Sequence, residues 1–472
     1  MNITHQNFVR IKMKKRIEII SLMIGLFAIV ACESSTINLR SLDSNLEQDQ
    51  DQQAGIAEDG PACTYDDQVV EPGASLTREG FQLELSTYGE ACVSEPQTGI
   101  CTGGNMVWDG SFENSACVQQ DFALIEVGMT STCALDARGK AYCWGQGDAG
   151  QLGNDSEEIK TVPEPVSGDL VFASLTGGLF FHCGLTAEGA AYCWGRNTLG
   201  QLGDGTNTNR LIPVPVSGGL VFKQIKAMYE HVCGVTNNNT AYCWGDNRAG
   251  QIGDGTIDGT DAGDNSKRVP TLVSGDNTFV AIAAGDVTSC ALNAVGQAFC
   301  WGDGGLGALG NGAEVNSLVP TAVAGNHSYS QISAGTSAAC GVKADDTAYC
   351  WGFGSVQLDG DDPTVPTLVA GNHKFKTISL GLNHRCGTTV DGNGLCWGNP
   401  LFGALGNGDI TNYQRIPSAV LDTTNFANIS GGSSHSCGLT EDGQAYCWGW
   451  GERGQRGDGT MIINSAQPVA VK

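Results

Sequence analysis

The chain has few basic residues and lacks the patterns that carry common enzyme chemistries. Its 472 residues include 25 Lys and Arg against 50 Asp and Glu, a formal net charge of −25. Binding to nucleic-acid phosphates depends on Lys and Arg displacing counterions, so the acidic balance argues against a nucleic-acid partner. The sequence shows no Ser-His-Asp set, no Cys-x-x-Cys pair and no phosphate loop ending in Lys-Ser or Lys-Thr. We therefore expect a protein that is not an enzyme and that needs no cofactor.

Sustained helical periodicity is absent as well, and a long apolar run occurs only near the N-terminus. The basic stretch 12–16 precedes an apolar run at 17–30, which is too short and too close to the start for a membrane span. The run ends in Ile-Val-Ala-Cys at 29–32, which resembles the lipobox of bacterial lipoproteins. That resemblance implies cleavage before Cys32 and lipid attachment to it. Either Met1 or Met13 can be the start of translation.

These features predict an exported protein held to the bacterial envelope by a lipid anchor alone. Glu33 stands where some bacteria use aspartate for inner-membrane retention, which favours the outer membrane or the cell surface. The sequence leaves the membrane and the leaflet open. We expect a monomer.

Composition divides the chain into four parts. Residues 1–31 are the predicted signal peptide, and 32–60 form a polar tether with little to bury. Residues 61–120 form a small β module whose cysteines leave three disulfide connectivities open: Cys63, Cys92, Cys101 and Cys117. Residues 121–472 contain a repeat of about fifty residues, the length of a four-stranded propeller blade. The fold class is thus all-β, a seven-bladed β-propeller preceded by a small disulfide-bonded β module.

Each repeat holds two cysteines ten residues apart, the second followed by Trp-Gly. The pairs are Cys133 with Cys143, Cys183 with Cys193, Cys233 with Cys243, Cys290 with Cys300, Cys340 with Cys350, Cys386 with Cys396 and Cys437 with Cys447. In a hairpin that turns midway between them the two cysteines lie directly opposite, within disulfide range. Metal binding is the alternative, but no further ligand set completes a zinc site. We predict seven disulfides, one within each blade.

The repeats resemble those of the regulator of chromosome condensation family. The resemblance rests on Gly-x-x-His-Ser-Cys-Gly-Leu-Thr-Glu-Asp-Gly at 432–443, the following Trp-Gly, and Gly-Gln-Leu-Gly-Asp-Gly at 200–205. It covers 121–472 and implies a seven-bladed propeller. The founding member's guanine-nucleotide exchange activity does not carry over, because this chain has an export signal, a strongly acidic charge and a cysteine pair in every blade.

Two further groups of residues can be read as metal sites, and we expect neither to be one. His182, His231, His384 and His435 lie one or two residues before a cysteine, at a position that the family uses structurally. The insertion from Asp258 to Asp264 holds three carboxylates whose spacing does not match a calcium-binding loop, and whether it binds calcium stays open.

Function should lie where the repeats differ. The turn before the first cysteine and the loop after Trp-Gly emerge on one face, where aromatic and arginine side chains gather, the residue types that dominate binding hot spots. We predict that this face binds a protein or glycan partner through Arg196, Arg248, Phe353, Phe402, Trp450 and Arg453. The leading hypothesis is a non-enzymatic interaction or adhesion module. An inhibitor of a secreted or host enzyme is the alternative, ahead of a carbohydrate-active enzyme or a nucleotide exchange factor. The ligand cannot be named from the sequence.

A last expectation concerns closure of the ring. The first repeat begins at Phe122 without a preceding Pro-x-x-Val segment, and the chain ends with one at 468–471. We expect this last strand to pair beside the strand at 122–128 and so complete the first blade, because an open ring would leave strand edges unpaired.

Overall fold

A computed structural model describes the strands between residues 63 and 108 and the ranges 121–257, 266–354, 362–421 and 425–472. The predicted anchor Cys32 and the insertion at 258–265 lie outside the described residues. In the N-terminal part, β1 (Cys63–Tyr65) pairs with β2 (Gln68–Val70). Three further strands form a separate sheet: β3 (Ser75–Gln82), β4 (Val93–Thr102) and β5 (Asn105–Trp108).

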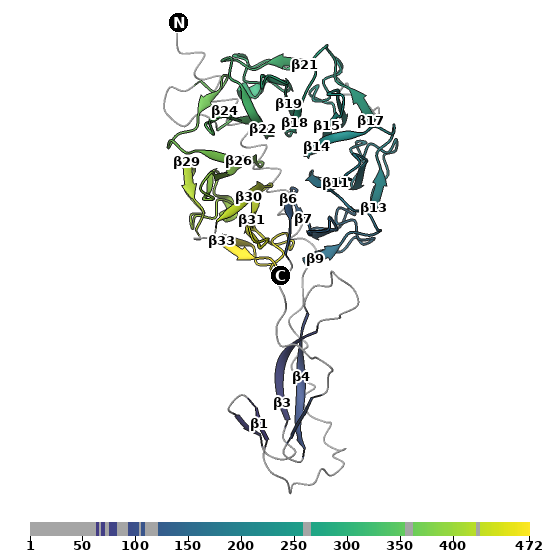
Figure 1. The fold of residues 1–472 in the computed structure, drawn as a ribbon, viewed down its shortest axis with the longest axis vertical. Coiled ribbons are helices and arrows are strands. Elements are labelled where there is room, and N and C mark those ends of the chain that lie inside the picture. The colour runs from purple at the N-terminus through teal and green to yellow at the C-terminus, as the bar shows by residue number, and fades with distance from the viewer. Residues whose placement is uncertain are drawn as a thin grey trace, which may run out of the picture. The chain divides into compact units, whose positions relative to one another are not determined.

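Seven four-stranded antiparallel sheets make up a β-propeller, as the sequence predicted (Figure 1). The first strand of each blade is innermost and borders the central channel. These first strands are β6 (Leu124–Val127), β10 (Ser174–Gly177), β14 (Phe222–Met228), β18 (Ala281–Ala284), β22 (Tyr329–Gly335), β26 (Phe375–Leu380) and β30 (Phe426–Gly431).

The second and third strands of each blade carry the two cysteines. The second strands are β7 (Ser131–Leu135), β11 (Phe181–Leu185), β15 (His231–Thr236), β19 (Thr288–Leu292), β23 (Ala338–Lys343), β27 (His384–Thr389) and β31 (His435–Thr440). The third strands are β8 (Ala141–Gly145), β12 (Ala191–Gly195), β16 (Ala241–Gly245), β20 (Ala298–Gly302), β24 (Ala348–Gly352), β28 (Gly394–Gly398) and β32 (Ala445–Trp450).

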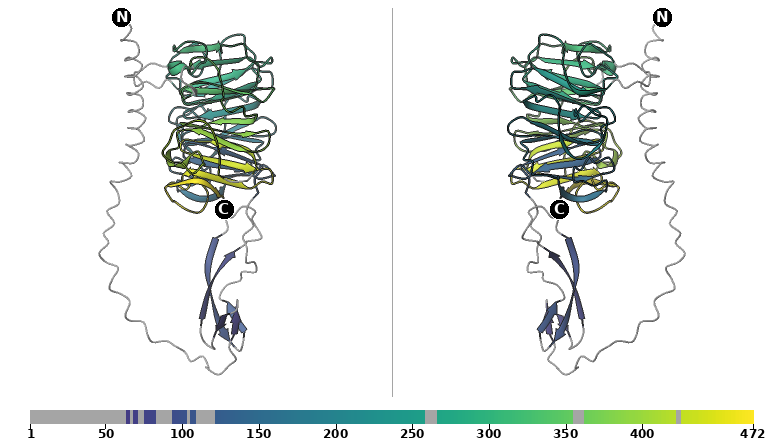
Figure 2. Two further views of the ribbon diagram at one scale, coloured as in Figure 1. Left: turned by 90° about the vertical axis from the view of Figure 1, so that its left-hand side faces the viewer. Right: turned by 90° about the vertical axis from the view of Figure 1, so that its right-hand side faces the viewer.

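The fourth strands form the outer edge of the disc. They are β9 (Lys160–Pro165), β13 (Arg210–Pro215), β17 (Lys267–Leu272), β21 (Ser317–Ala322), β25 (Thr367–Leu368), β29 (Gln414–Ala419) and β33 (Asn464–Ala470). Side views show the strands running from one face of the disc to the other (Figure 2). In the described part of the chain the only helices are the short 3-10 turns η1 (Gly305–Gly307) and η2 (Leu401–Gly403), and no helix there could span a membrane.

The predicted disulfides form in all seven blades. Cys133 lies directly opposite Cys143 in the β7–β8 register, and the Cα atoms are 4.1 Å apart. The other six disulfides repeat this arrangement with Cα separations of 4.0–4.1 Å: Cys183 with Cys193, Cys233 with Cys243, Cys290 with Cys300, Cys340 with Cys350, Cys386 with Cys396 and Cys437 with Cys447. The prediction that the two cysteines of a repeat lie opposite each other and form a disulfide is therefore confirmed in every repeat.

Each disulfide also belongs to a core shared with the neighbouring blade. Cys133 and Cys143 cluster with Phe172 and Trp194 of the second blade. The disulfides Cys233–Cys243 and Cys290–Cys300 lie in the equivalent clusters with Trp301 and Trp351 of the next blade, and Cys340–Cys350 lies in the one with Trp397. The cysteines therefore help to fill the core between blades as well as to close hairpins.

The repeated Trp-Gly has a separate explanation for each residue. The seven tryptophans are buried between blades, and the indole of Trp144 donates to the carbonyl of Gln455 at 3.1 Å. The glycine that follows, Gly145, has φ of +106°, and a Cβ there would lie 2.8 Å from the backbone of Thr130 and Ser131. Only glycine fits this strand end, because the preceding turn packs directly against it.

The expectation for ring closure was wrong. The last strand, β33, pairs with β32 and is the outer strand of the seventh blade, while the first blade is completed by β9. Every Pro-x-x-Val segment contributes to the fourth strand of the blade whose other three strands precede it in the chain. The first blade is therefore complete without the last segment, which the seventh blade needs. The order is favoured because each blade then forms from consecutive strands joined by short connections.

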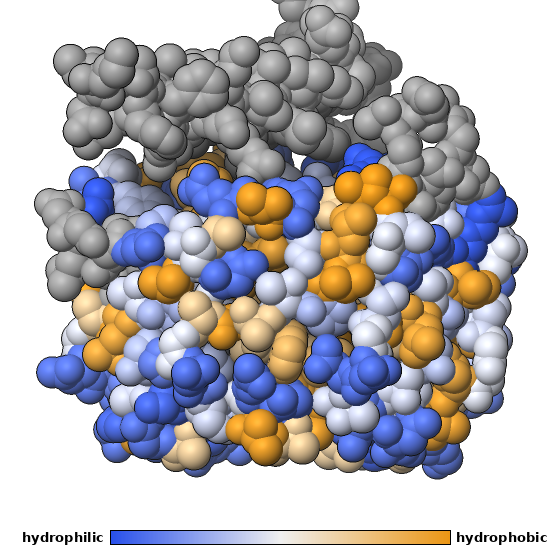
Figure 3. All heavy atoms as spheres, turned by 90° about the horizontal axis from the view of Figure 1, so that it is seen from above, coloured by the Kyte–Doolittle hydropathy of each residue, from blue (hydrophilic) through white to orange (hydrophobic). Residues whose placement is uncertain are grey.

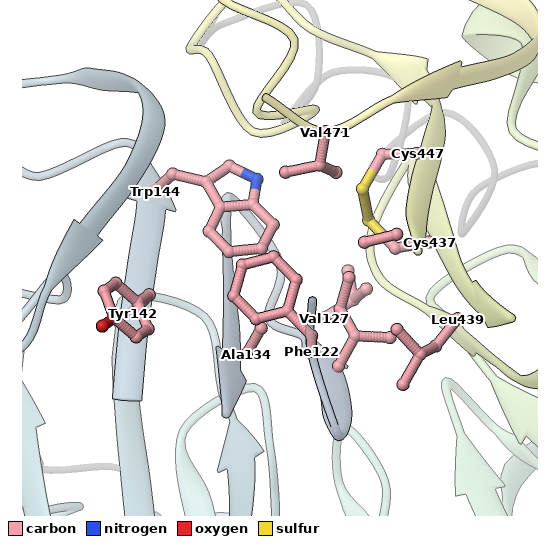
Figure 4. Close-up of a cluster of buried hydrophobic side chains, with 11 residues drawn as sticks. Phe122, Val127, Ala134, Tyr142, Trp144, Cys437, Leu439, Cys447 and Val471 are labelled. Carbon is pink, nitrogen blue, oxygen red and sulfur yellow. A yellow bond between two sulfur atoms is a disulfide. The ribbon is translucent and has the colours of Figure 1, made fainter. Parts of the chain in front are cut away.

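Side chains and backbone contacts close the ring between the seventh and first blades (Figure 4). Phe122, Val127 and Trp144 pack with Leu439, Val471 and the Cys437–Cys447 disulfide. The Val127 amide donates to the Ser430 hydroxyl at 3.2 Å, and the Phe122 amide to the Gly443 carbonyl at 2.8 Å. The closing contact is therefore of the same kind as the contacts between other neighbouring blades.

Candidate binding face and central channel

Strand direction alternates within a blade, so the connections divide between two faces. We call the face with the turns between first and second strands and the loops between third and fourth strands the loop face. The opposite face carries the hairpins between the two cysteines and is called the hairpin face. All six predicted partner-binding residues lie on the loop face, at the end of a third strand or just beyond it: Arg196, Arg248, Phe353, Phe402, Trp450 and Arg453.

Two of the predicted arginines meet on the second and third blades around one carboxylate that the sequence analysis did not single out. Glu230 lies 3.3 Å from the Arg196 guanidinium and 3.0 Å from that of Arg248. Arg248 also contacts Asp246 at 2.8 Å and keeps 64% of its side chain exposed, whereas Glu230 keeps 8%. The two arginines are thus partly exposed, and the buried carboxylates of Glu230 and Asp246 balance their positive charge.

Side chains alternate between the two sides of a strand, and the aromatic residues beside these arginines are accordingly divided between the core and the surface. Phe181 is fully buried, while Phe180 stays partly exposed with its ring centre 5.6 Å from the Arg196 guanidinium carbon. Successive residues of a strand point to opposite sides of the sheet, and Phe181 accordingly points inward. Tyr229, at the corresponding turn of the third blade, has φ of +53°, an uncommon conformation for a bulky residue.

Carboxylates gather beside these arginines, and the pKa of two of them is raised. We call Glu230, Asp246, Asp286 and Asp303 the acidic cluster. Burial raises the pKa of Asp286 to about 7, and the negative charges of Asp246 and Glu230 add to the effect. Burial likewise raises the pKa of Glu230 although Arg196 and Arg248 oppose the change. Burial and repulsion between carboxylates thus favour the protonated forms of Asp286 and Glu230 in this part of the loop face.

A second group of predicted residues meets on the sixth and seventh blades. The Phe402 and Trp450 rings lie 6.0 Å apart, and both side chains are partly exposed. Phe402 has φ of +61° inside the short turn η2. Beside Trp450, the buried Arg456 donates to the carbonyls of Ile462 and Gly449 at 3.0 and 3.2 Å. The loop after β32 is thereby held in place from underneath.

The two remaining predicted residues lie outside these groups. Phe353, on the fifth blade, is partly exposed, and its carbonyl accepts a hydrogen bond from the buried Arg385 guanidinium. Arg453 is partly exposed in the loop after Trp450, and within the described ranges its guanidinium has no ion-pair partner. The structure thus brings together Arg196 with Arg248 and Phe402 with Trp450.

The central channel contains a cavity of about 340 Å³ lined by the first strands. The residue opposite the first cysteine of each blade belongs to a ring of seven equivalent positions: Glu126, Thr176, Lys226, Ala283, Ser333, Ser379 and Ser430. All of them except the buried Thr176 line this cavity. The four hydroxyls accept backbone N–H groups of the next blade, as Ser379 does from Gly431 at 3.1 Å. Glu126 and Lys226 instead form a 3.5 Å ion pair that bypasses the second blade. Aligning the seven repeats would have found this departure.

The four histidines do not converge on a metal site. Each is buried and lies within hydrogen-bond distance of a hydroxyl on a neighbouring blade: His182 with Ser131, His231 with Ser289, His384 with Ser436 and His435 with Thr132, at 2.7–3.0 Å. Burial lowers the pKa of His182 and His435 to about 3 and that of His231 and His384 to about 4. They are neutral links between blades, which agrees with the structural role that was expected.

Comparisons with known proteins identify the repeat. A model of the regulator of chromosome condensation (RCC1) repeat matches residues 138–176, 188–235, 238–292 and 295–342. A second model of the repeat matches 172–201, 222–251 and 426–455. The ultraviolet-B receptor UVR8 of Arabidopsis thaliana is 38% identical over 73 residues, which span 15% of this chain and 16% of the receptor.

Solved structures agree on the architecture. Human WBSCR16 is similar with a TM-score of 0.63 and 22% identity over 71% of this chain and 94% of that one. Yeast RCC1 (Prp20) is similar with a TM-score of 0.62 and 21% identity over 75% of this chain and 85% of that one. Likeness at this level of identity establishes the fold, whereas function has to be argued from the sites on it.

Proposed function

The chain carries regulator of chromosome condensation repeats folded into a seven-bladed propeller, and we propose that it is an exported, lipid-anchored binding protein without catalytic activity. Its macromolecular partner binds the loop face. One observation carries the proposal: the strands repeat from blade to blade, while the loop face differs and exposes arginine and aromatic side chains. A propeller needs only turns at these places, so the large exposed side chains there have no structural task.

Export is supported by cysteine chemistry. Seven paired, buried disulfides form and persist in an oxidising compartment and are rare in the cytoplasm. The lipid anchor rests on the sequence at 29–32. If Cys32→Ser leaves the protein in the membrane fraction with its lipid label intact, the anchor is elsewhere.

Two comparison structures give the proposal a precedent in kind. Yeast RCC1 was solved with Kap60 bound, and a second study of the same protein, Prp20p, concerns its binding to Gsp1p and histones. Those partners belong to that protein. The strongly acidic chain described here, with its predicted export signal, calls for a different one.

The partner can be sought by fusing a proximity-labelling enzyme to the chain in its native cell and identifying labelled proteins by mass spectrometry. Calorimetry then compares alanine variants of Phe402, Trp450 and Arg453 with hairpin-face variants of Arg138, Glu188 and Glu441. We expect a true anchor on the loop face to cost about 2 kcal/mol, roughly thirty-fold in affinity. If only the hairpin-face variants lose affinity, the binding face is the opposite one.

A further inference from the structure

We propose that the partner is a cationic protein segment with an exposed apolar side chain, and that this side chain docks on an apolar patch of the sixth and seventh blades. The inference rests on the proposed function and adds the chemistry of the partner. The patch consists of Phe402 and Trp450 together with Leu401, Ile410, Met461, Ile462 and Ile463, and is called the blade 6–7 patch.

Exposed apolar residues are consecutive here, which is unusual for this molecule. Met461, Ile462 and Ile463 are 51%, 61% and 55% exposed. The corresponding loops of the first two blades are polar, reading Asn-Asp-Ser-Glu-Glu at 154–158 and Thr-Asn-Thr-Asn at 206–209. On the outer edge that includes β21, apolar residues form separate spots among polar ones (Figure 3). Single exposed apolar residues are ordinary, whereas a continuous patch marks an interaction site.

Backbone contacts join the two loops into one surface. The Gly451 amide donates to the Ile463 carbonyl at 2.8 Å, which holds Ile463 beside the end of β32. The Gly408 amide, two residues before Ile410, donates to the Ala466 carbonyl of the seventh blade at 2.9 Å. The contact between Phe402 and Trp450 bridges the same two blades. The patch is therefore a fixed feature of two packed blades.

Phe402 lies in the short turn η2, where it has φ of +61° and its ring lies beside Trp450. Leu306 has the same φ in η1, the equivalent turn of the fourth blade, so the turn sets this conformation in both blades. The two turns continue with the same residues, Gly-Ala-Leu-Gly-Asn-Gly, and differ in the side chain at this position. The sixth blade thus uses a shared turn to place an aromatic ring beside Trp450.

Charge selects the occupant of the patch. The chain has a formal net charge of −25, which repels a second copy of itself and the surface of an anionic membrane. A segment that offers an apolar anchor with lysine or arginine on its flanks complements both the apolar patch and the negative net charge of the chain. Opposite charges on the chain and its partner also raise the rate of association.

A random-peptide phage library selected on the full chain carrying Cys32→Ser tests the inference without a known partner. We expect enriched peptides in which lysine or arginine flanks tryptophan, leucine or isoleucine. A synthetic peptide of the enriched sequence should bind the double variant Ile462→Ser, Ile463→Ser about tenfold or more weakly. The matched control is Val295→Ser, because Val295 is 73% exposed on a hairpin of the opposite face.

Several outcomes would overturn the inference. Enrichment of acidic peptides contradicts the charge argument, and enriched peptides that bind the double variant as well as the parent contradict the patch. Patch-dependent binding to phosphatidylglycerol vesicles would assign it to a membrane, and patch-dependent sedimentation as a dimer to a second copy. Peptide binding lost with Arg196→Ala but unaffected at the patch would leave the loop face as the binding face while refuting this partner chemistry. Loss with Val295→Ser alone would refute the proposed function itself.

Discussion

The second and third strands of each blade are nearly alike seven times over, whereas the loops after the third strand differ in charge and apolar character. Trp448 and Trp450 show the contrast within one strand, β32. Trp448 is fully buried and repeats in every blade, and Trp450 is partly exposed and occurs once. The repeated residue serves packing between blades, and the unrepeated one is free to serve recognition. Four predictions test this division, from the largest expected effect to the smallest.

Acid should affect the repeated strands most, because they hold the four buried histidines. Their folded-state pKa of about 3 or 4 lies below the ordinary value of 6.5, so between these values the unfolded chain binds protons that the folded chain does not. Protonation of these histidines therefore does not reduce the free energy of unfolding above pH 6.5. It falls on acidification to about pH 4, by roughly 1.4 kcal/mol per pH unit for each histidine.

Asp286 changes the free energy of unfolding in the opposite direction over this range and offsets the effect of one histidine. The reason is that its pKa is raised to about 7, so the folded chain holds its proton. Denaturant unfolding at several pH values measures the slope. His435→Gln should reduce the slope of the free energy of unfolding against pH by the contribution of one histidine. A slope unchanged in this variant would show that His435 does not titrate on unfolding.

The two tryptophans of β32 give the sharpest direct comparison. Trp448→Ala removes a side chain with no exposed surface and should cost roughly 3–5 kcal/mol of stability. Trp450→Ala should cost less than about 1 kcal/mol and act on partner binding instead. Thermal unfolding and calorimetry with the partner measure the two effects. If both variants lose similar stability, Trp450 belongs to the scaffold and the division fails in this blade.

Removal of one disulfide should cost about the same in any blade. Replacing Cys183 and Cys193 by alanine frees an eleven-residue loop in the unfolded chain, worth roughly 2–3 kcal/mol in the chain-entropy model. The equivalent change at Cys386 and Cys396 is the control, since both pairs are fully buried. Chemical denaturation measures the two losses. A large difference between them would mean that the repeats are not energetically equivalent.

Substitutions in the ring of equivalent residues around the central channel should have the smallest effects on stability. Here too, a repeated contact between blades is compared with one that occurs once. Ser379→Ala removes the acceptor of the Gly431 amide and should cost roughly 1–2 kcal/mol. Lys226→Met removes one partner of a half-exposed ion pair and should cost less than about 1 kcal/mol. Urea unfolding curves separate the two. A larger loss for Lys226→Met would make the Glu126–Lys226 pair a structural contact.

Local features of the chain could be predicted because they depend on residues close in sequence. The ten-residue spacing fixes a hairpin in which Cys133 faces Cys143, and the fifty-residue period fixes a propeller blade. The predicted loop face followed from strand alternation alone. The ring closure was missed because a Pro-x-x-Val segment can pair with the strand before it or with the first strand of the chain. Short connections decide between them, and the sequence pattern is the same for both.

By itself, the sequence determined the fold class, the seven disulfides, the buried tryptophans and the face on which the unrepeated residues emerge. Each of these follows from spacing within one repeat. Only the tertiary structure decided that Arg196 and Arg248 share Glu230, that Glu126 pairs with Lys226 and that His435 reaches Thr132. These contacts join residues 18 to 303 positions apart, and the curvature of the closed ring brings them together. No local pattern records that curvature, because it arises from the packing of seven blades against one another.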